Sequence, residues 1–230
     1  MKGAVLVTGG AKRIGLAICD ALRARGWTVL VHSRDPANPL CADLAEPGGA
    51  DRLFDRAVAA APDLCAVVGN ASEFSLAADP PPAVADRLMR VNAAAPVRLA
   101  ELLHARLRAQ GRAGAVVNLL DTRVLGASAA SLRTPYARAK AALRDATLDQ
   151  ARALAPVLRV NAVAPGPVLL PANPACAEPG GAILLARRPS PADVAASVAF
   201  LLESEFLTGQ ILAVDAGQSL LSAPRGRSGR

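Results

Sequence analysis

The sequence contains little of what metal or disulfide chemistry requires. Its 230 residues include two histidines and four cysteines, and no two cysteines form a Cys-x-x-Cys pair. Two imidazoles argue against a histidine-based metal site, so we expect no bound metal. Scattered thiols are typical of reduced proteins, and we expect a cytoplasmic location.

Aromatic residues are equally scarce, at 3% of the chain, and no basic run is interleaved with them. Proteins that bind single-stranded nucleic acid use such aromatic platforms, so we expect no nucleic-acid partner. The net charge is +7, but three arginines fall within residues 223–230, which leaves +4 for the rest. That balance suits an anionic small ligand. We predict one domain over residues 1–222, followed by a basic, disordered tail over 223–230.

Long hydrophobic runs are also missing. The longest uncharged stretch, residues 160–177, contains four prolines, which a membrane-spanning helix would not tolerate. The apolar run after Lys2 is too short for the core of a signal peptide. We therefore expect no membrane association.

The chain does contain a regular alternation of short apolar runs and longer helical patterns. Hydrophobic residues make up 52% of it and charged residues 20%, as in a compact fold. We expect strands at 4–9, 28–32, 40–44, 64–70, 115–120, 158–165 and 210–215, and helices at 13–25, 49–60, 82–109, 134–154 and 191–203. This order predicts a single-domain α/β fold, a Rossmann-like doubly wound parallel sheet of about seven strands with helices on both faces. The irregular loop 166–188 is the candidate substrate lid.

The turn after the first strand reads TGGAKRIG, residues 8–15. Gly9 and Gly10 allow a tight turn, and the helix that follows offers free N–H groups to a diphosphate. Glycine is common in such turns, but this position in an alternating α/β fold favours a dinucleotide site. Arg13 replaces the usual middle glycine, and its guanidinium could reach a phosphate or a planar ligand.

The second strand ends in VHSRD, where NAD-specific enzymes place an acid that binds the adenosine ribose. His32, Ser33 and Arg34 present donors instead, which suits a 2′-phosphate and predicts NADPH as the cofactor. Asp35 follows one step into the loop, where a solvated role fits it. The alternative is that Arg34 is an ordinary surface residue.

The helix near residue 134 contains YARAK, so Tyr136 and Lys140 lie one turn apart on the same face. An ammonium group near the phenol would lower the pKa of Tyr136 toward neutral pH. We expect Tyr136 to act as a general acid in a reduction.

These motifs together resemble the short-chain dehydrogenase/reductase family over essentially the whole chain. The matching stretches are TGGAKRIG, DL at 43–44, GNAS at 69–72, VNAAAP at 91–96, YARAK at 136–140, RVNAVAPG at 159–166 and LTGQILAVDAG at 207–217. The resemblance implies cofactor contacts at Thr8, Gly9, Lys12, Arg13, Ile14, Gly15, His32, Ser33, Arg34, Asp43, Leu44, Asn70, Ala71, Ser72, Tyr136, Lys140, Pro165 and Gly166.

The resemblance also assigns individual roles. Asp43 and Leu44 should meet the adenine, and the Pro165–Gly166 backbone should face the nicotinamide. Asn92 should hold a proton-relay water beside Lys140, which would also bind the nicotinamide ribose. The resemblance further implies a homotetramer with the long helices as contacts.

Asp121, which ends the fifth strand, departs from the usual family pattern. The family normally places serine there as a donor to a substrate carbonyl, whereas an ionised carboxylate can only accept. The branch of pteridine and dihydromonapterin reductases is similar to this chain in four respects: Asp at this place, Arg in the glycine-rich turn, HSR after the second strand and NASEF at 70–74. The resemblance therefore implies reduction of a dihydropteridine (dihydromonapterin, dihydrobiopterin or dihydrofolate type) to its tetrahydro form.

A pterin ring fits the residues that this branch would use. Phe74 could stack on one face of the ring and Arg13 could bind its edge. Asp121 could orient Tyr136 or a water that protonates a ring nitrogen. The expected catalytic residues are Asp121, Tyr136, Lys140 and Asn92, and the expected substrate contacts are Arg13, Ser72, Phe74, Asp121, Tyr136 and Leu170.

The gap between Asp121 and Tyr136 is fifteen residues, two more than the family usually shows. Ser128 and Ser131 are alternative donors, in which case the enzyme would reduce a ketone such as a 3-oxoacyl thioester. A non-catalytic NADPH-binding sensor is a second alternative, and the intact set of Asn92, Tyr136 and Lys140 argues against it. Substrate contacts at Leu169, Leu170 and Pro171 stay open.

Overall fold

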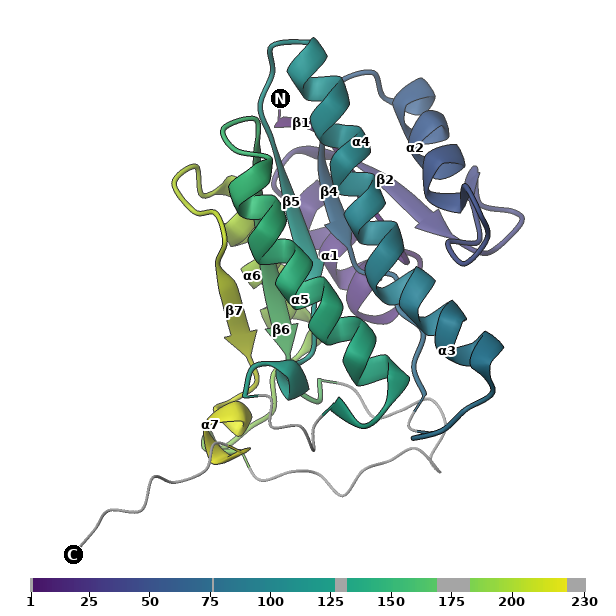
Figure 1. Cartoon of the computed structure of the whole chain (residues 1–230). Coiled ribbons are helices and arrows are strands. Elements are labelled where there is room, and N and C mark those ends of the chain that lie inside the picture. Colours follow the sequence, from purple (N-terminus) through teal and green to yellow (C-terminus); the bar gives the residue numbers. More distant parts are fainter. Residues whose placement is uncertain (1, 76, 127–131, 169–182, 223–230) are drawn as a thin grey trace, which may run out of the picture.

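The protein folds around one seven-stranded parallel sheet. The computed structural model describes residues 2–75, 77–126, 132–168 and 183–222 (Figure 1). The strands are β1 (Lys2–Val7), β2 (Trp27–Ser33), β3 (Leu40–Cys41), β4 (Leu64–Gly69), β5 (Gly114–Leu119), β6 (Leu158–Pro165) and β7 (Ile211–Val214). Their order in the sheet is β3-β2-β1-β4-β5-β6-β7. The predicted doubly wound α/β fold is confirmed.

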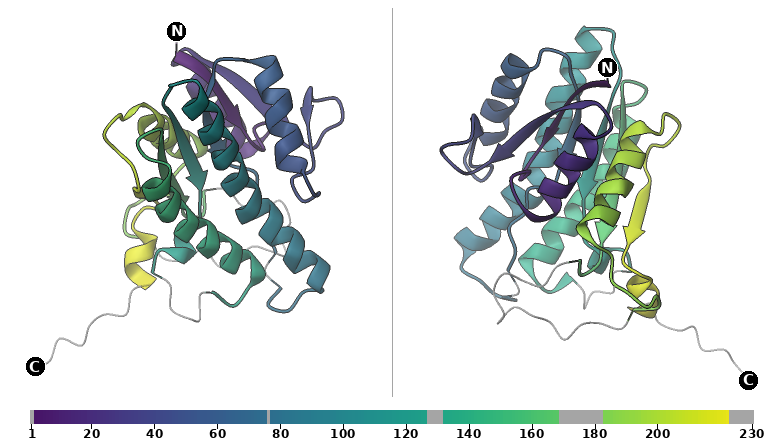
Figure 2. Two further views of the ribbon diagram at one scale, coloured as in Figure 1. Left: turned by 45° about the horizontal axis from the view of Figure 1, so that its top comes forward. Right: turned by 180° about the vertical axis from the view of Figure 1, so that it is seen from behind.

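Helices cover both faces of this sheet. Those on one face are α2 (Gly49–Ala60), α4 (Ala95–Ala109) and α5 (Pro135–Ala153), and those on the other are α1 (Arg13–Arg23) and α6 (Pro191–Glu203), seen in front in the right-hand view of Figure 2. Helix α3 (Pro82–Met89) precedes α4, the short α7 (Gln218–Ser222) follows β7, and a 3₁₀ turn, η2 (Thr122–Val124), follows β5.

The two faces explain why the strands read as continuous apolar runs. In β1, Ala4 and Leu6 pack into the core beneath α2 and α4, whereas Val5 and Val7 pack into the core beneath α1 and α6. Successive side chains of a strand point to opposite faces, and here both faces are dry.

The structure departs from the predicted elements in two places near the cleft. Strand β3 keeps two residues of the expected 40–44, because the carboxylate of Asp43 accepts a hydrogen bond from the Ala45 N–H and turns the chain away. The expected helix over 82–109 is divided by a π-helical turn, η1 (Arg90–Ala94), which contains Asn92. Such wide turns are frequent at functional sites.

The parallel strands all end at one edge of the sheet. At this edge β1 and β4 are neighbours, with β2 and β3 on one side of them and β5 to β7 on the other. This is the place where open α/β sheets bind ligands. Most of the expected lid, at residues 169–182, and the predicted tail lie outside the described residues. Within the described part of the chain, no helix has the length and apolarity needed to cross a membrane.

Gly15, in the first turn of α1, touches the backbone of the turn after β1. A Cβ at Gly15 would overlap the Gly9 carbonyl oxygen and would lie 2.6 Å from Nδ2 of Asn70. That same Asn70 amide nitrogen donates to the carbonyls of Thr8 and Gly9, at 2.9 and 3.0 Å. The turn therefore closes only when position 15 has no side chain.

We expect Gly15→Ala to lower the free energy of unfolding by about 1–3 kcal/mol, the usual cost of overpacking. For a chain of this size each kcal/mol corresponds to a fall of about 2–4 °C in Tm, which calorimetry would measure. Gly126→Ala is the control, since a Cβ there meets nothing within 4 Å. Equal Tm values for the two variants would contradict the packing argument.

Candidate active site

A cavity of about 530 Å³ opens at the carboxyl ends of β1, β2 and β4. The expected cofactor residues that line it are Gly9, Lys12, Arg13, Ile14, Gly15, His32, Ser33, Arg34, Asp43, Leu44, Asn70, Ala71 and Ser72. Glu73 and Asp35 also line it, although neither was expected to contact the cofactor. The glycine-rich turn and the end of β2 thus form one continuous wall.

The N-terminus of α1 faces this cavity. No side chain caps the helix at Lys12, so the N–H groups of its first turn remain available to an anion. Arg13 takes a left-handed backbone conformation with φ of 56°, at the position where the family usually has glycine. A non-glycine residue costs about 1–3 kcal/mol in such a conformation, and such costs are typical of functional sites.

His32 holds the turn rather than facing the cavity as a donor. Its Nδ1 accepts the Gly9 N–H at 3.1 Å, so Nε2 carries the ring proton and donates it to the Ala42 carbonyl, also at 3.1 Å. Burial lowers the pKa of the imidazole and keeps it neutral. The expectation that His32 donates to a 2′-phosphate is therefore wrong for this structure, because both ring nitrogens are already used.

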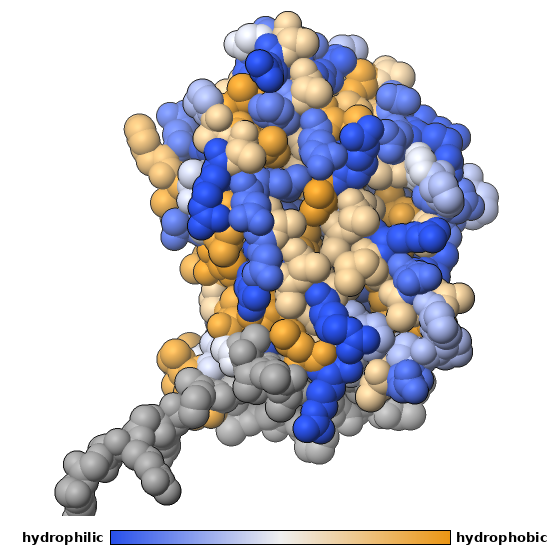
Figure 3. Space-filling view, in the orientation of Figure 1, coloured by the Kyte–Doolittle hydropathy of each residue, from blue (hydrophilic) through white to orange (hydrophobic). Residues whose placement is uncertain are grey.

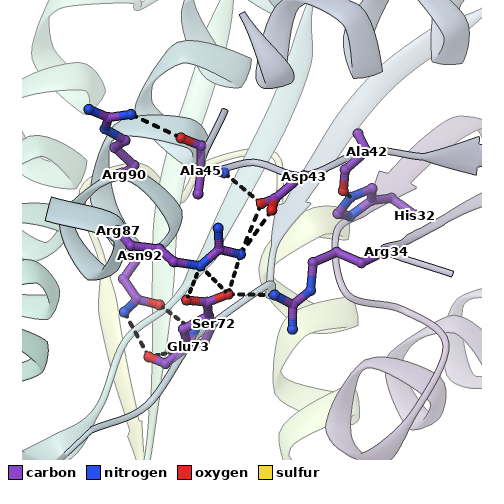
Figure 4. Close-up of polar contacts among 10 residues, drawn as sticks. All are labelled: His32, Arg34, Ala42, Asp43, Ala45, Ser72, Glu73, Arg87, Arg90 and Asn92. Carbon is purple, nitrogen blue, oxygen red and sulfur yellow. Dashed lines mark hydrogen bonds and ion pairs between the residues drawn. The ribbon is translucent and has the colours of Figure 1, made fainter. Parts of the chain in front are cut away.

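Arg34 and Asp43 belong to a network of four charged side chains beside the cavity, near the end of β2 (Figure 4). Arg34 contacts the carboxylate of Glu73 at 2.6 Å, and Glu73 in turn accepts from Arg87. Arg87 also binds both carboxylate oxygens of Asp43. The backbone N–H of Ala45 and the guanidinium of Arg87 hold the pKa of Asp43 below its ordinary value, against the opposing effect of burial.

Asn92 is fully buried and binds the segment that follows β4. Its Oδ1 accepts the Glu73 N–H at 3.0 Å, and its Nδ2 donates to the Glu73 carbonyl at 2.8 Å (Figure 4). The side chain was expected to hold a water beside Lys140. Each polar atom of its side chain instead makes one hydrogen bond to the Glu73 backbone, so Asn92 positions this loop, and the relay water beside Lys140 stays a prediction.

Asp121 and Tyr136 meet despite the longer path between them. The carboxylate caps η2 by accepting the Arg123 N–H at 2.9 Å, and its other oxygen accepts the Tyr136 hydroxyl at 3.1 Å. Ser128 and Ser131, the alternative donors, lie outside the described residues, as do Leu169, Leu170 and Pro171.

Phe74 stands beside this pair with nearly half of its surface exposed. Its ring meets that of Tyr136 edge-on, with 4.8 Å between centroids, and the guanidinium of Arg123 lies 5.5 Å from the Phe74 centroid. The exposed ring is therefore available to a flat ligand. Arg123 was missed from the sequence, although its place two residues after Asp121 was a usable signal.

Lys140 lies deep in the site and points at the end of β5. It is 2% exposed, its Nζ donates to the Leu119 carbonyl at 2.7 Å, and it stands 6.0 Å from the Tyr136 ring centroid. Burial lowers its pKa to about 8.

The pKa of Tyr136 is raised well above its ordinary value, first by burial and then by the charge and hydrogen bond of Asp121. The predicted lowering by Lys140 is therefore wrong for this structure. Asp121 accepts a hydrogen bond from the phenol, whereas the ammonium of Lys140 donates to the Leu119 carbonyl.

Pro165 and Gly166 end β6, where the Gly166 N–H donates to the Val214 carbonyl at 3.0 Å. A Cβ at Gly166 would lie 2.8 Å from Cβ of Asp215, so the chain passes close to β7 at this edge. Over the described ranges, no three His, Cys, Asp or Glu side chains gather in a way that could hold a metal ion. Cys19, Cys41 and Cys65 are free thiols, and Cys176 lies outside the described residues.

Comparison with known proteins gives relatives over nearly the whole chain. A dihydromonapterin reductase of Klebsiella pneumoniae is 30% identical over 233 residues, which cover 94% of this chain and 96% of that protein. A putative ketoacyl reductase of the granaticin polyketide synthase of Streptomyces violaceoruber is also 30% identical, with coverage of 94% and 96%.

A solved structure agrees in fold as well as in sequence. The crystal structure of FolM alternative dihydrofolate reductase 1 from Brucella canis, complexed with NADP, superposes with a TM-score of 0.83 at 31% identity. The match covers 98% of this chain and 96% of that one. A family model described as enoyl-(acyl carrier protein) reductase matches residues 9–219. The glycine-rich turn at the cavity and the Tyr136–Lys140 pair agree with these matches. The chain therefore belongs to the short-chain dehydrogenase/reductase family.

Proposed function

We propose that this protein reduces a dihydropteridine to its tetrahydro form with NADPH. The observation that carries the proposal is the Asp121 carboxylate in hydrogen-bond contact with the Tyr136 hydroxyl, beside the exposed ring of Phe74. The similarity to a dihydromonapterin reductase and to a dihydrofolate reductase complexed with NADP supports it.

The cavity fits a phosphorylated dinucleotide. The uncapped first turn of α1 would bind the diphosphate, and Ser33 and Arg34 would meet the 2′-phosphate. Asp43 and Leu44 form the wall expected to meet adenine. When bound, NADPH supplies the hydride.

The carboxylate at position 121 favours a pterin over a ketone. An ionised Asp accepts hydrogen bonds and donates none, so it cannot polarise a ketone oxygen. A pterin carries N–H groups along its amide-like edge, and a carboxylate binds these well. Tyr136, kept protonated by the raised pKa of its phenol, holds a proton for a ring nitrogen, directly or through a water.

The assembly and location are also part of the proposal. The face of the molecule in Figure 3, over α4 and α5, gathers apolar side chains at its centre with hydrophilic ones around them. We propose that these long helices join protomers into a homotetramer, and that the enzyme works in the cytoplasm.

Replacing Asp121 by Ser should lower turnover of a dihydropterin about 100-fold or more, the usual contribution of a positioned acid–base group. The assay follows NADPH oxidation with dihydromonapterin, dihydrofolate or acetoacetyl thioester as substrate. Asp149→Ser, at an exposed acid of α5, is the matched control and should keep full activity.

Robust reduction of the thioester with no pterin turnover in the wild type would overturn the pteridine proposal in favour of a ketone reductase. Binding of NADPH with no turnover of any substrate would favour a sensor.

Lys140 should make stability depend on pH in a defined direction. Its pKa is about 8 in the folded chain and about 10.4 when unfolded, so between these values the unfolded state binds the extra proton. The unfolding free energy of the wild type should therefore rise relative to Lys140→Met as pH increases from 8 to 10, by about 2 kcal/mol. Urea unfolding of both proteins at pH 7, 8, 9 and 10 measures this difference.

Lys12→Met, at an exposed lysine, is the control and should show no such trend. A pH-independent difference between wild type and Lys140→Met would mean that the ammonium is not buried in solution.

A further inference from the structure

The carboxylate of Glu73 lies between two guanidinium groups at the adenosine end of the cavity (Figure 4). Toward β2 it makes one ion pair, with Nη1 of Arg34 at 2.6 Å. Toward α3 it accepts from Nε and Nη2 of Arg87, at 2.8 to 3.1 Å. Glu73 thus joins opposite walls of the cleft. It makes three hydrogen bonds with Arg87 but one contact with Arg34.

The position of this carboxylate is fixed from within. The backbone of Glu73 is bound on both its N–H and its carbonyl by the buried side chain of Asn92. The Glu73 side chain is 21% exposed, whereas that of Arg34 is 61% exposed. The rigid partner is therefore the acid, and the arginine is the partner that can move.

Arg34 is also the side chain that we assign to the 2′-phosphate. It cannot give its best hydrogen bonds to Glu73 and to a phosphate at once, since both need the same planar edge of the guanidinium. Release of Arg34 would still leave Glu73 bound to Arg87, which also neutralises Asp43. The exchange therefore leaves no carboxylate unpaired.

We propose that Glu73 limits the affinity for NADPH by occupying Arg34, so that a 2′-phosphate has to displace this carboxylate before it binds the arginine. A ribose with plain hydroxyls competes poorly with a carboxylate for a guanidinium, and NADH therefore meets a cleft in which Arg34 stays bound to Glu73. NADPH displaces Glu73 and binds Arg34, at the cost of breaking the pair. The inference rests on the proposed NADPH dependence and adds a residue that weakens NADPH binding and leaves NADH binding nearly unchanged.

The test is the effect of Glu73→Gln on binding of NADPH and NADH by the whole protein, measured by isothermal titration calorimetry. Glutamine keeps a hydrogen bond to Arg87 but loses the charge that holds Arg34. We expect NADPH to bind about 5-fold more tightly, as the loss of an exposed ion pair implies, and NADH to change by less than about 2-fold. The pair 2′,5′-ADP and 5′-AMP should show the same contrast without the nicotinamide.

Two further variants separate this role from a structural one. Glu101→Gln removes an exposed acid of α4 that pairs with Arg98. Neither residue lines the cavity, so both affinities should stay unchanged. In an Arg34→Ala background, Glu73→Gln should no longer favour NADPH, because the arginine that it releases is absent.

The outcomes distinguish the two levels of the proposal. If the wild type binds NADH as tightly as NADPH, the cofactor assignment itself fails. If NADPH is preferred but Glu73→Gln leaves the ratio of the two affinities unchanged, or if it tightens binding equally in the Arg34→Ala background, the role of Glu73 is overturned. Thermal unfolding of each variant verifies that the fold is intact.

Discussion

The two hydrogen bonds between the Asn92 side chain and the backbone of Glu73 fix the segment on which the site depends. This segment, residues 70–74, begins where β4 ends and has to serve both halves of the sheet. Its first residue, Asn70, closes the glycine-rich turn, and its last, Phe74, touches Tyr136. Because Asn92 is fully buried and both polar atoms of its side chain bind this segment, the proposed cofactor cleft and substrate platform share one rigid support.

The site buries polar and ionisable side chains, and this burial costs folding free energy. Lys140 is among the largest fully buried side chains, and one backbone carbonyl is its hydrogen-bond acceptor. Next to it, the Tyr136 hydroxyl is held by an acid that disfavours its ionisation. Burial of charge is expensive unless it is compensated, and catalytic groups are where folds tolerate it. The same residues that weaken the fold would hold the proton in place for the proposed reaction.

The fold could be predicted from the sequence because short apolar runs alternate with longer stretches of helical periodicity along the whole chain. The meeting of Asp121 with Tyr136 was expected only from the family resemblance, because the longer path between them carries no signal of where the helix begins. The direction of His32 could not be predicted, since both faces of β2 are covered and no polar alternation marks which side is buried. Lys140 shares a helix face with Tyr136, but spacing does not say which atom a long side chain will reach. The contact between Glu73 and Arg87 could not be predicted from the sequence, because it depends on how α3 is rotated relative to the sheet.

That rotation originates in the π-helical turn over Arg90–Ala94. A turn closed by an i→i+5 hydrogen bond, here from the Ala95 N–H to the Arg90 carbonyl, holds one residue more than an α-helical turn. One residue corresponds to about 100° of helical phase. The extra residue therefore rotates α3 relative to α4 by about this angle. With this rotation, α4 packs Leu99 and Leu103 into the core. At the same time, α3 directs Arg87 toward Asp43 and Glu73. Loss of a single residue here would keep the helix and its packing, yet turn the arginine away from the cleft.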